Sequence, residues 1–206
     1  GIELAGESAG VVPALRQWQG GSFANLPIGQ GLSITLLQMA SIYQAIANDG
    51  LRIPPRIIAS ITKPNGQVVH QGSPAGIRVV SAETARTVRN MFRAVVQSDT
   101  GYQQGTGPQA SVEGYQISGK TGTAQQVDPR CNCYSNSMYW ITFAGIAPAD
   151  NPRYVIAIML DNPVRGVHGE GGQSAAPLFH DIAQWLLTRD NVPLSPPAPR
   201  LILQAG

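Results

Sequence analysis

Ser118-Gly-Lys-Thr-Gly-Thr-Ala-Gln125 is the stretch that decides the fold of this chain, because it suits either a strand or a helix N-terminus. Together with the residues from Gly114 onward, it matches the phosphate-loop pattern Gly-x4-Gly-Lys-Thr. A phosphate loop lies between a buried strand and a helix. Residues 105–113 contain no apolar run, and residues 122–129 are a short polar stretch between a glycine and a proline. We therefore predict an extended segment and no phosphate loop.

An edge strand beside a cleft is the favoured interpretation of this stretch. Alternation along a strand places Lys120 and Gly122 on one face and Thr121 and Thr123 on the other. Gly122 would let a ligand lie close to the backbone, Lys120 would supply positive charge, and the threonine hydroxyls could hold a carboxylate. Serine acyl-transferases that bind β-lactams carry such a Lys-Thr-Gly strand. A plain edge strand with a solvated lysine is the alternative that the three residues alone leave open.

The composition points to one loop-rich domain. The chain has 206 residues, 43% hydrophobic and 13% charged, with 23 glycines and 16 prolines, which favours an α+β protein with a real core. The net charge of +2 comes from scattered residues, so no nucleic-acid partner is expected. No apolar run reaches the ~20 residues of a membrane span, and no signal peptide is found. We expect any anchor or export signal to lie outside this chain.

Periodicity and capping residues predict the order of the elements. Thr35 and Gln38 form a capping box before an apolar helix that ends at residues 48–50. The other expected elements are a hairpin over 56–70, a helix over 81–97, strands over 115–125, 139–147 and 153–161, a polar loop over 126–138, a helix over 174–189, and a loose Pro-rich tail over 193–206.

These elements predict a short antiparallel sheet with the C-terminal helix packed on one face. Tyr154 to Leu160 is apolar on both faces, so the second face of the sheet needs cover as well, and little else in the chain is available to provide it. Cys131 and Cys133 lie in the polar loop, either as free thiols or as a tight disulfide. No further ligands cluster near them, so neither a metal site nor a cofactor is expected.

Six segments that span most of the chain carry a further signal: residues 1–8, 28–40, 47–50, 119–125, 143–154 and 171–179. In this order, the segments resemble class B penicillin-binding proteins, and the division-specific FtsI-type transpeptidases in particular. The resemblance implies that residues 1–192 are the C-terminal portion of a transpeptidase domain whose upstream half is missing, followed by the Pro-rich tail at 193–206.

The resemblance also places the nucleophile, in a Ser-x-x-Lys motif, and a Ser-x-Asn motif upstream of this chain. Ser60-Ile-Thr-Lys63 is a Ser-x-x-Lys string, but it reads as a strand entering the turn Pro64-Asn-Gly66. The working motif needs a helix that sets serine and lysine one turn apart, so we reject this string. Ser135-Asn-Ser137 ends in serine and does not match Ser-x-Asn.

The activity implied by the resemblance is peptidoglycan D,D-transpeptidation in septal wall synthesis. An upstream serine attacks the D-Ala–D-Ala bond of a stem peptide, and an amine of a second stem resolves the acyl-enzyme into a cross-link. Lys120 and Thr123 would be catalytic, the backbone N–H of Thr123 forming half of the oxyanion hole. Lys120, Thr121, Gly122 and Thr123 would bind substrate, and β-lactams would acylate the same serine.

The implied partners are the upstream half of the domain, as a segment or a separate chain, stem peptides, β-lactams and divisome membrane proteins. The implied location is the outer side of the bacterial plasma membrane, held by an N-terminal anchor absent here. A D,D-carboxypeptidase, a serine β-lactamase or a non-catalytic antibiotic sensor would share the strand, although Ala175-Ala-Pro177 favours the transpeptidase. His70 and His180 are expected to be structural, while His168 and the loop 126–138 are expected to flank opposite rims of the cleft.

Overall fold

The computed structural model describes residues 5–70, 72, 74–98, 104–164 and 172–198, and it confirms the α+β class. The helices and strands are α1 Ser22–Asn25, α2 Leu36–Ala47, β1 Leu51–Arg52, β2 Ser60–Thr62, β3 Val68–His70, β4 Ile77–Arg78, α3 Ala82–Met91, β5 Ser118–Asp128, β6 Cys133–Ala147, β7 Tyr154–Asp161 and α4 Ala175–Arg189. No helix among the described residues is long and apolar enough to cross a membrane.

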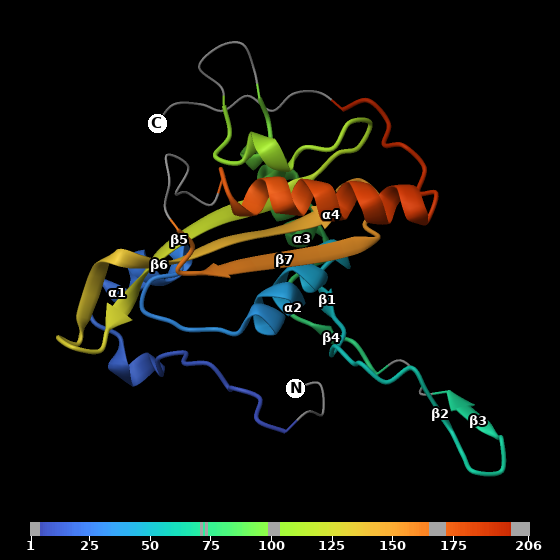
Figure 1. The fold of residues 1–206 in the computed structure, drawn as a ribbon, viewed down its shortest axis with the longest axis horizontal. Helices are drawn as coiled ribbons and strands as arrows, with labels where there is room; N and C mark the ends of the chain where they lie inside the picture. Colours follow the sequence, from blue (N-terminus) through green and yellow to red (C-terminus); the bar gives the residue numbers. More distant parts are fainter. Residues whose placement is uncertain (1–4, 71, 73, 99–103, 165–171, 199–206) are drawn as a thin grey trace.

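A three-stranded antiparallel sheet in the order β5-β6-β7 forms the centre of the molecule (Figure 1). Its three predicted strands are confirmed, although β5 begins at Ser118 and not at Tyr115. The prediction of a polar loop over 126–138 was wrong. There β5 continues to Asp128 and β6 already begins at Cys133, because these ends pair with each other in a short ladder of their own.

Helix α4 covers one face of the sheet, as predicted (Figure 1). Phe179 of α4 is fully buried against Phe143 of β6, with ring centroids 4.8 Å apart. Gly145 makes room for this contact, because a Cβ there would lie 2.7 Å from the ring of Phe179. The aromatic pair therefore fixes where α4 crosses the sheet.

Helix α2 covers the other face, which contradicts the expectation that little in the chain could do so (Figure 1). Tyr43 of α2 packs on Ala144 and Ile146 of β6, and its ring stacks on Phe92 with centroids 5.6 Å apart. Burial raises the pKa of the Tyr43 hydroxyl well above its ordinary value, so the group stays protonated. The apolar face of α2 was visible in the sequence, but its place on the sheet was not.

The helix starts follow the predicted caps. Gln38 donates its backbone N–H to Thr35 Oγ1 at 3.1 Å, and the side-chain oxygen of Gln38 accepts the N–H of Thr35 at 2.8 Å. Ser81 accepts the N–H of Thr84 at 3.0 Å and caps α3. Helix α3 ends at Met91, short of the predicted residue 97, and continues as a 3₁₀ turn over Phe92–Val95.

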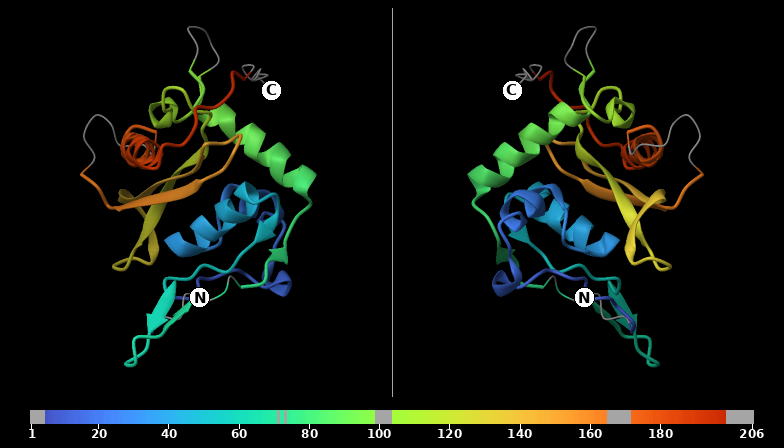
Figure 2. Two further views of the ribbon diagram at one scale, coloured as in Figure 1. Left: turned by 90° about the vertical axis from the view of Figure 1, so that its right-hand side faces the viewer. Right: turned by 90° about the vertical axis from the view of Figure 1, so that its left-hand side faces the viewer.

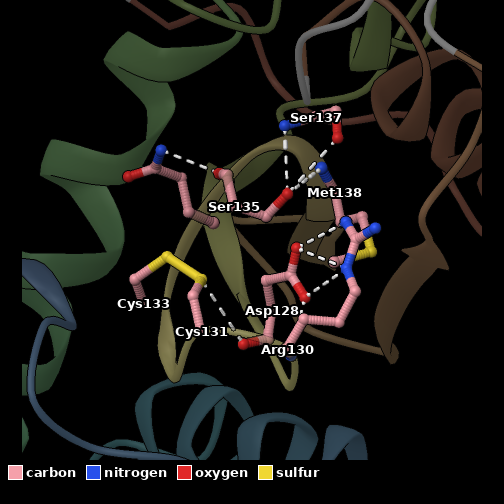
Figure 3. Close-up of a disulfide and its surroundings, with 8 residues drawn as sticks. Asp128, Arg130, Cys131, Cys133, Ser135, Ser137 and Met138 are labelled. Atoms are coloured by element: carbon pink, nitrogen blue, oxygen red, sulfur yellow. Dashed lines mark hydrogen bonds and ion pairs between the residues drawn. A yellow bond between two sulfur atoms is a disulfide. The ribbon is translucent and has the colours of Figure 1, made fainter.

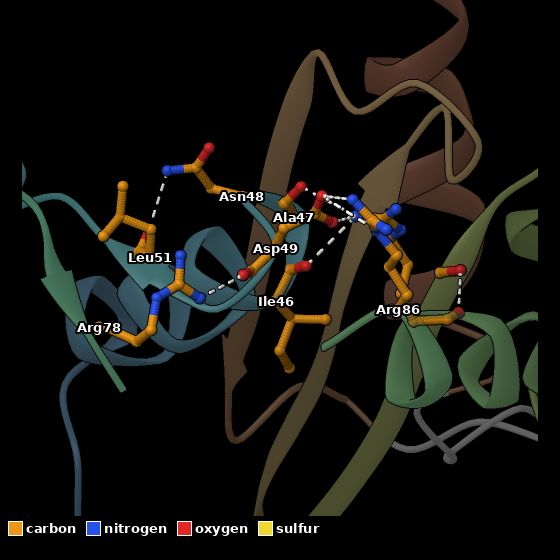
Figure 4. A network of polar contacts seen from close by, with 9 residues as sticks. Ile46, Ala47, Asn48, Asp49, Leu51, Arg78 and Arg86 are labelled. Carbon is orange, nitrogen blue, oxygen red and sulfur yellow. Dashed lines mark hydrogen bonds and ion pairs between the residues drawn. The ribbon is translucent and has the colours of Figure 1, made fainter. Parts of the chain in front are cut away.

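Asp49 joins the end of α2 to α3 and β4 (Figure 4). Its carboxylate accepts from Arg86 Nη2 at 2.6 Å and from Arg89 Nη1 at 3.2 Å. Arg89 also donates to the Ala47 carbonyl at 2.9 Å, and Arg78 donates to the Asp49 carbonyl at 2.9 Å. The hydrogen bond from Arg86 holds the pKa of the Asp49 carboxyl below its ordinary value.

The predicted hairpin is confirmed as β2 and β3, which project away from the rest of the molecule (Figure 2). Gly66, at φ +80°, closes the turn by donating its N–H to the Lys63 carbonyl at 2.9 Å. Ser60 therefore lies in a strand and Lys63 in a turn. This geometry supports rejecting the pair as a helical Ser-x-x-Lys motif.

The first part of the Pro-rich tail is not loose, so that expectation was wrong for residues 193–198. Ser195 donates its N–H to the Gly114 carbonyl at 2.9 Å and accepts the N–H of Gln116 on its hydroxyl at 3.0 Å. Gln116 also donates its side-chain amide to the Pro196 carbonyl at 2.9 Å. These bonds hold the tail along the segment that leads into β5.

Replacing Phe179 by alanine tests the α4 packing. We expect Phe179→Ala to lower the free energy of unfolding of the complete protein by about 3–5 kcal/mol, because it empties a closed part of the core. Chemical denaturation measures this change. The control is Leu178→Ala on the same helix, where a side chain 40% exposed should cost under about 1 kcal/mol. Equal losses for the two variants would contradict the packing.

Asp49 predicts a pH-dependent contribution to stability. Because its pKa is lowered in the folded state, its ionised form stabilises the fold above the ordinary aspartate pKa of about 3.9, and the effect disappears as the pH falls through the lowered value. We expect Asp49→Asn to cost about 1 kcal/mol at pH 7, a modest value because the side chain is 35% exposed. Denaturation of both proteins should converge at acidic pH, below the lowered pKa of Asp49, while exposed Glu113→Gln serves as the control. A difference that persists unchanged at low pH would contradict this role.

Candidate functional site

The Lys-Thr-Gly segment lies in the middle of β5, at the edge of the sheet. Strand β5 pairs with β6, and no other strand in the described part of the chain pairs with its outer edge. Gly119 lies opposite Gly145 and Gln125 opposite Tyr139, so the segment is extended throughout. The strand prediction is confirmed, and Lys120 does not precede a helix as a phosphate loop requires.

The side chains alternate across the sheet as the sequence predicted. Lys120 lies opposite Ala144 and Gly122 opposite Thr142, on the face that α2 covers. Thr121 lies on the α4 face, where its hydroxyl is 2.9 Å from the hydroxyl of Thr106. Thr123 shares that face by alternation and is exposed.

A groove of about 540 Å³ runs between β5 and the segment that leads into α2. Lys120 is the charged residue among the described residues that line it, and its Nζ donates to the Thr121 carbonyl at 3.0 Å. The lining consists of Ile28, Gly29, Leu32, Ile34, Thr35, Leu36, Met39, Tyr43, Phe92, Lys120, Thr121, Gly122, Thr123, Ala124, Thr142, Ala144, Ile158 and Met159. One cation beside hydroxyl and apolar groups suits an organic carboxylate.

The backbone of Thr123 points to the open edge of the sheet. On β6, the carbonyl of Tyr139 accepts from Asn162, and the carbonyl of Ala147 accepts from Arg153 beyond the start of β7. Odd-numbered residues of β6 therefore direct their backbone N–H and C=O groups toward β7, and even-numbered residues direct theirs toward β5. Since Thr142 pairs with Gly122, the neighbouring Thr123 directs its N–H away from β6. The edge thus offers an unpaired donor close to Lys120.

The tip of the β5–β6 hairpin continues the two strands beyond the Lys-Thr-Gly segment (Figure 3). Cys131 and Cys133 are joined by a disulfide, which resolves the two alternatives that the sequence left open. Asp128 accepts from Arg130 at 2.7 Å, and this hydrogen bonding lowers the pKa of the Asp128 carboxyl. The tip, at residues 127–138, is therefore a closed structure and not the polar loop that was predicted.

The histidines fall outside the groove or outside the described residues. His70 is exposed on β3, in the projecting hairpin, and His180 of α4 bonds through Nδ1 to the carbonyl of Ser111. His168 lies outside the described residues. Among the residues that the structure describes, no three His, Cys, Asp or Glu side chains are placed to hold a metal ion.

Sequence reasoning missed three residues of the site. Thr142 faces Gly122, Thr106 bonds to Thr121, and Tyr43 lies at the base of the groove. The alternation of Thr142 with Phe143 and Ala144 was visible in the sequence, but the register that sets Thr142 beside Gly122 was not. No local pattern marked Thr106.

Comparison with known proteins agrees with this geometry. Residues 1–184 match the family described as "Penicillin binding protein transpeptidase domain". Penicillin-binding protein PbpB of Mycolicibacterium smegmatis is 66% identical over 206 residues, covering 99% of this chain and 32% of its own. A "Probable peptidoglycan D,D-transpeptidase PenA" of Neisseria meningitidis is 35% identical over 179 residues, covering 86% of this chain and 27% of its own.

A solved structure has the same fold. The crystal structure of penicillin-binding protein 3 from Mycobacterium tuberculosis, complexed with ampicillin, superposes with a TM-score of 0.92 at 66% identity, covering all of this chain and 46% of that one. The chain belongs to the penicillin-binding protein transpeptidase domain family. It spans about a third of the length of the curated relatives it matches.

Gly122 provides a structural test of the site. A Cβ at this position would lie 2.2 Å from Thr142 Oγ1, so Gly122→Ala should lower the free energy of unfolding by about 1–3 kcal/mol through overpacking. Adding Thr142→Ala removes the clashing oxygen and should recover most of this loss in chemical denaturation. A double variant no more stable than Gly122→Ala alone would contradict the observed register.

Proposed function

We propose that this chain is the C-terminal part of a serine D,D-transpeptidase that cross-links peptidoglycan stem peptides. One observation carries the proposal: β5 presents Lys120 to the groove and the backbone N–H of Thr123 to the open edge. A cation and an outward donor on one edge strand suit a peptide that ends in a carboxylate. The names of the relatives support the same reaction class.

The serine is proposed to come from upstream residues. Among the described residues, Ser60 and Lys63 fit the Ser-x-x-Lys spacing, but they lie in a strand and a turn. Because the chain spans about a third of its relatives, we infer that the missing upstream half supplies the Ser-x-x-Lys and Ser-x-Asn motifs beside the groove. Residues 1–192 would then be the C-terminal portion of the domain, and residues 193–206 its tail.

The edge strand would act on the transition state of acyl transfer. The serine Oγ attacks the carbonyl carbon of the D-Ala–D-Ala bond, and the developing oxyanion is held by the N–H of Thr123 and by the serine's own N–H. Lys120 attracts the terminal carboxylate, which Thr121 and Thr123 help to hold. The Thr121 hydroxyl, which is hydrogen-bonded to the Thr106 hydroxyl at 2.9 Å, can donate a hydrogen bond to that carboxylate. The amine of a second stem peptide then releases the acyl group as a cross-link.

The proposed ligands and location follow from the same reaction. β-Lactams would acylate the serine, and the tuberculosis relative was crystallised with ampicillin. Peptidoglycan lies outside the plasma membrane, so we infer an envelope location with an N-terminal anchor upstream of this chain. Septal synthesis and contact with divisome membrane proteins belong to the proposal because the resemblance is to FtsI-type enzymes.

Two substitutions in β5 test the proposal in the complete protein. Thr123→Pro removes the outward N–H and should slow acylation by a fluorescent penicillin by about 10²–10³-fold. Lys120→Ala should slow it at least about tenfold, because the carboxylate loses its cation. Lys63→Ala changes the other lysine of the chain, in the β2–β3 hairpin, and should leave acylation unchanged. Acylation at wild-type rates in both β5 variants would overturn the assignment.

Deacylation separates the transpeptidase from its rivals. A transpeptidase should hold the penicilloyl group as a stable acyl-enzyme, detected by intact mass, because its deacylation step uses an amine. Rapid release of hydrolysed β-lactam would instead indicate a β-lactamase. A complete protein that never forms the adduct would indicate a sensor or scaffold.

A further inference from the structure

The tip of the β5–β6 hairpin, residues 127–138, forms a flap that is separate from the regular ladder. It continues the proposed substrate-binding strand β5. The regular ladder ends where Gln125 lies opposite Tyr139, and the next pair is Val127 with Tyr134. Between these pairs β5 has one residue, Gln126, while β6 has the four residues 135–138. A bulge of this kind interrupts the sheet and lets the two parts bend relative to each other.

Side chains, and not ladder bonds, hold the bulge together (Figure 3). Ser135 Oγ accepts the N–H groups of Ser137 and Met138 at 3.1 and 3.0 Å. Gln125 donates to the Ser135 carbonyl at 2.9 Å, and Gln126 donates to Asp161 Oδ1 at 2.8 Å. The base of the flap is therefore fixed to the sheet.

Besides the turn bonds that Asp128 accepts from the N–H groups of Asn132 and Arg130, both at 2.9 Å, the outer part of the flap has few other supports. Its ladder consists of the two pairs Val127–Tyr134 and Asp128–Cys133, and a ladder this short is marginal in water. The ion pair of Asp128 with Arg130 is exposed, since Arg130 is 87% accessible, and exposed ion pairs contribute little. The Cys131–Cys133 disulfide is thus the strongest constraint on the outer part of the flap.

Both cysteines are exposed, and they are the two cysteines of this chain. We propose that Cys131–Cys133 is a thiol-exchange site whose reduction unlocks the flap and lowers substrate access to the β5 edge. This inference rests on the proposed function. The co-reactant is a thiol or dithiol: its thiolate attacks one Sγ and expels the other as a thiolate, and a second thiol then resolves the mixed disulfide. The net change is two cysteine thiols formed and one external disulfide made.

Reduction would affect substrate access because the flap contains the end of β5, the strand that also forms the binding edge. Val127 follows Thr123 after three residues and is 52% exposed, and its partner Tyr134 is 65% exposed. A peptide lying along the open edge of β5 past Thr123 would continue along the flap at Val127, on the same strand. Once the flap opens, the fraction of molecules that present the complete edge falls, and apparent affinity falls with it.

Tryptic cleavage after Arg130 reports on the flap without any reference to activity. A bridge closing so short a loop shifts the opening equilibrium by about tenfold, so cleavage of the complete protein should be about tenfold faster after treatment with dithiothreitol. The Cys131→Ser/Cys133→Ser variant should be cleaved at the fast rate with or without dithiothreitol. Asp128→Asn, which removes the ion pair and keeps the bridge, should stay near the oxidised wild-type rate. Alkylation and peptide mass confirm the state of the two cysteines.

Acylation by a fluorescent penicillin, in the same samples, tests the effect on access. We expect reduction to slow it by about three- to tenfold, and the double serine variant to be slow and insensitive to dithiothreitol. Equal cleavage rates before and after reduction, or equal acylation rates despite faster cleavage, would overturn the inference. If no sample is acylated in either state, the proposed function fails and the access effect fails with it, while cleavage still shows whether the bridge locks the flap.

Discussion

The register between β5 and β6 is the constraint on which the rest of the site depends. With Gly122 opposite Thr142, even-numbered residues of β5 bond to β6, and odd-numbered residues turn their backbone groups outward. A slip by one residue would move Lys120 to the face covered by α4 and turn the Thr123 N–H into the sheet. The register therefore determines both the face on which the Lys120 side chain lies and the outward direction of the Thr123 N–H.

Two helices hold that register by covering the two faces of the sheet. Phe179 of α4 fits against Gly145 and Phe143 on one side, while Tyr43 of α2 packs on Ala144 and Ile146 on the other. Helix α3 links these layers, since the carbonyl of Arg89 accepts from Ser118 at 2.6 Å and its guanidinium reaches the end of α2. The start of β5 is thus tied directly to the network around Asp49.

In the proposed function, the groove beside β5 is one part of a larger site. Its floor is apolar and its charge comes from Lys120, which suits ligand recognition more than bond cleavage. The nucleophile proposed for the upstream half would complete it, and the flap at residues 127–138 continues β5 beyond the residues that line the groove. The nucleophile and the Thr123 donor of the oxyanion hole would then be contributed by different parts of the domain.

The sequence by itself determined the local structure and the identity of the edge strand. Alternation placed Lys120 and Gly122 on one face, the Thr35 and Ser81 caps fixed the helix starts, and the turn at Pro64-Asn-Gly66 excluded Ser60 as a helical nucleophile. Each of these features depends on residues within a few positions of one another, so propensity and hydrogen-bonding chemistry suffice to predict them.

Only the tertiary structure decided the cover of the second face by α2, the Thr106–Thr121 pair, the closed flap and the attachment of Ser195 to Gly114 and Gln116. Most of these contacts join residues that are distant in the chain. The flap is a turn whose shape depends on the strands that enter it. An apolar face in the sequence predicts that a helix will be buried, but the surface it packs against depends on the packing of the whole chain.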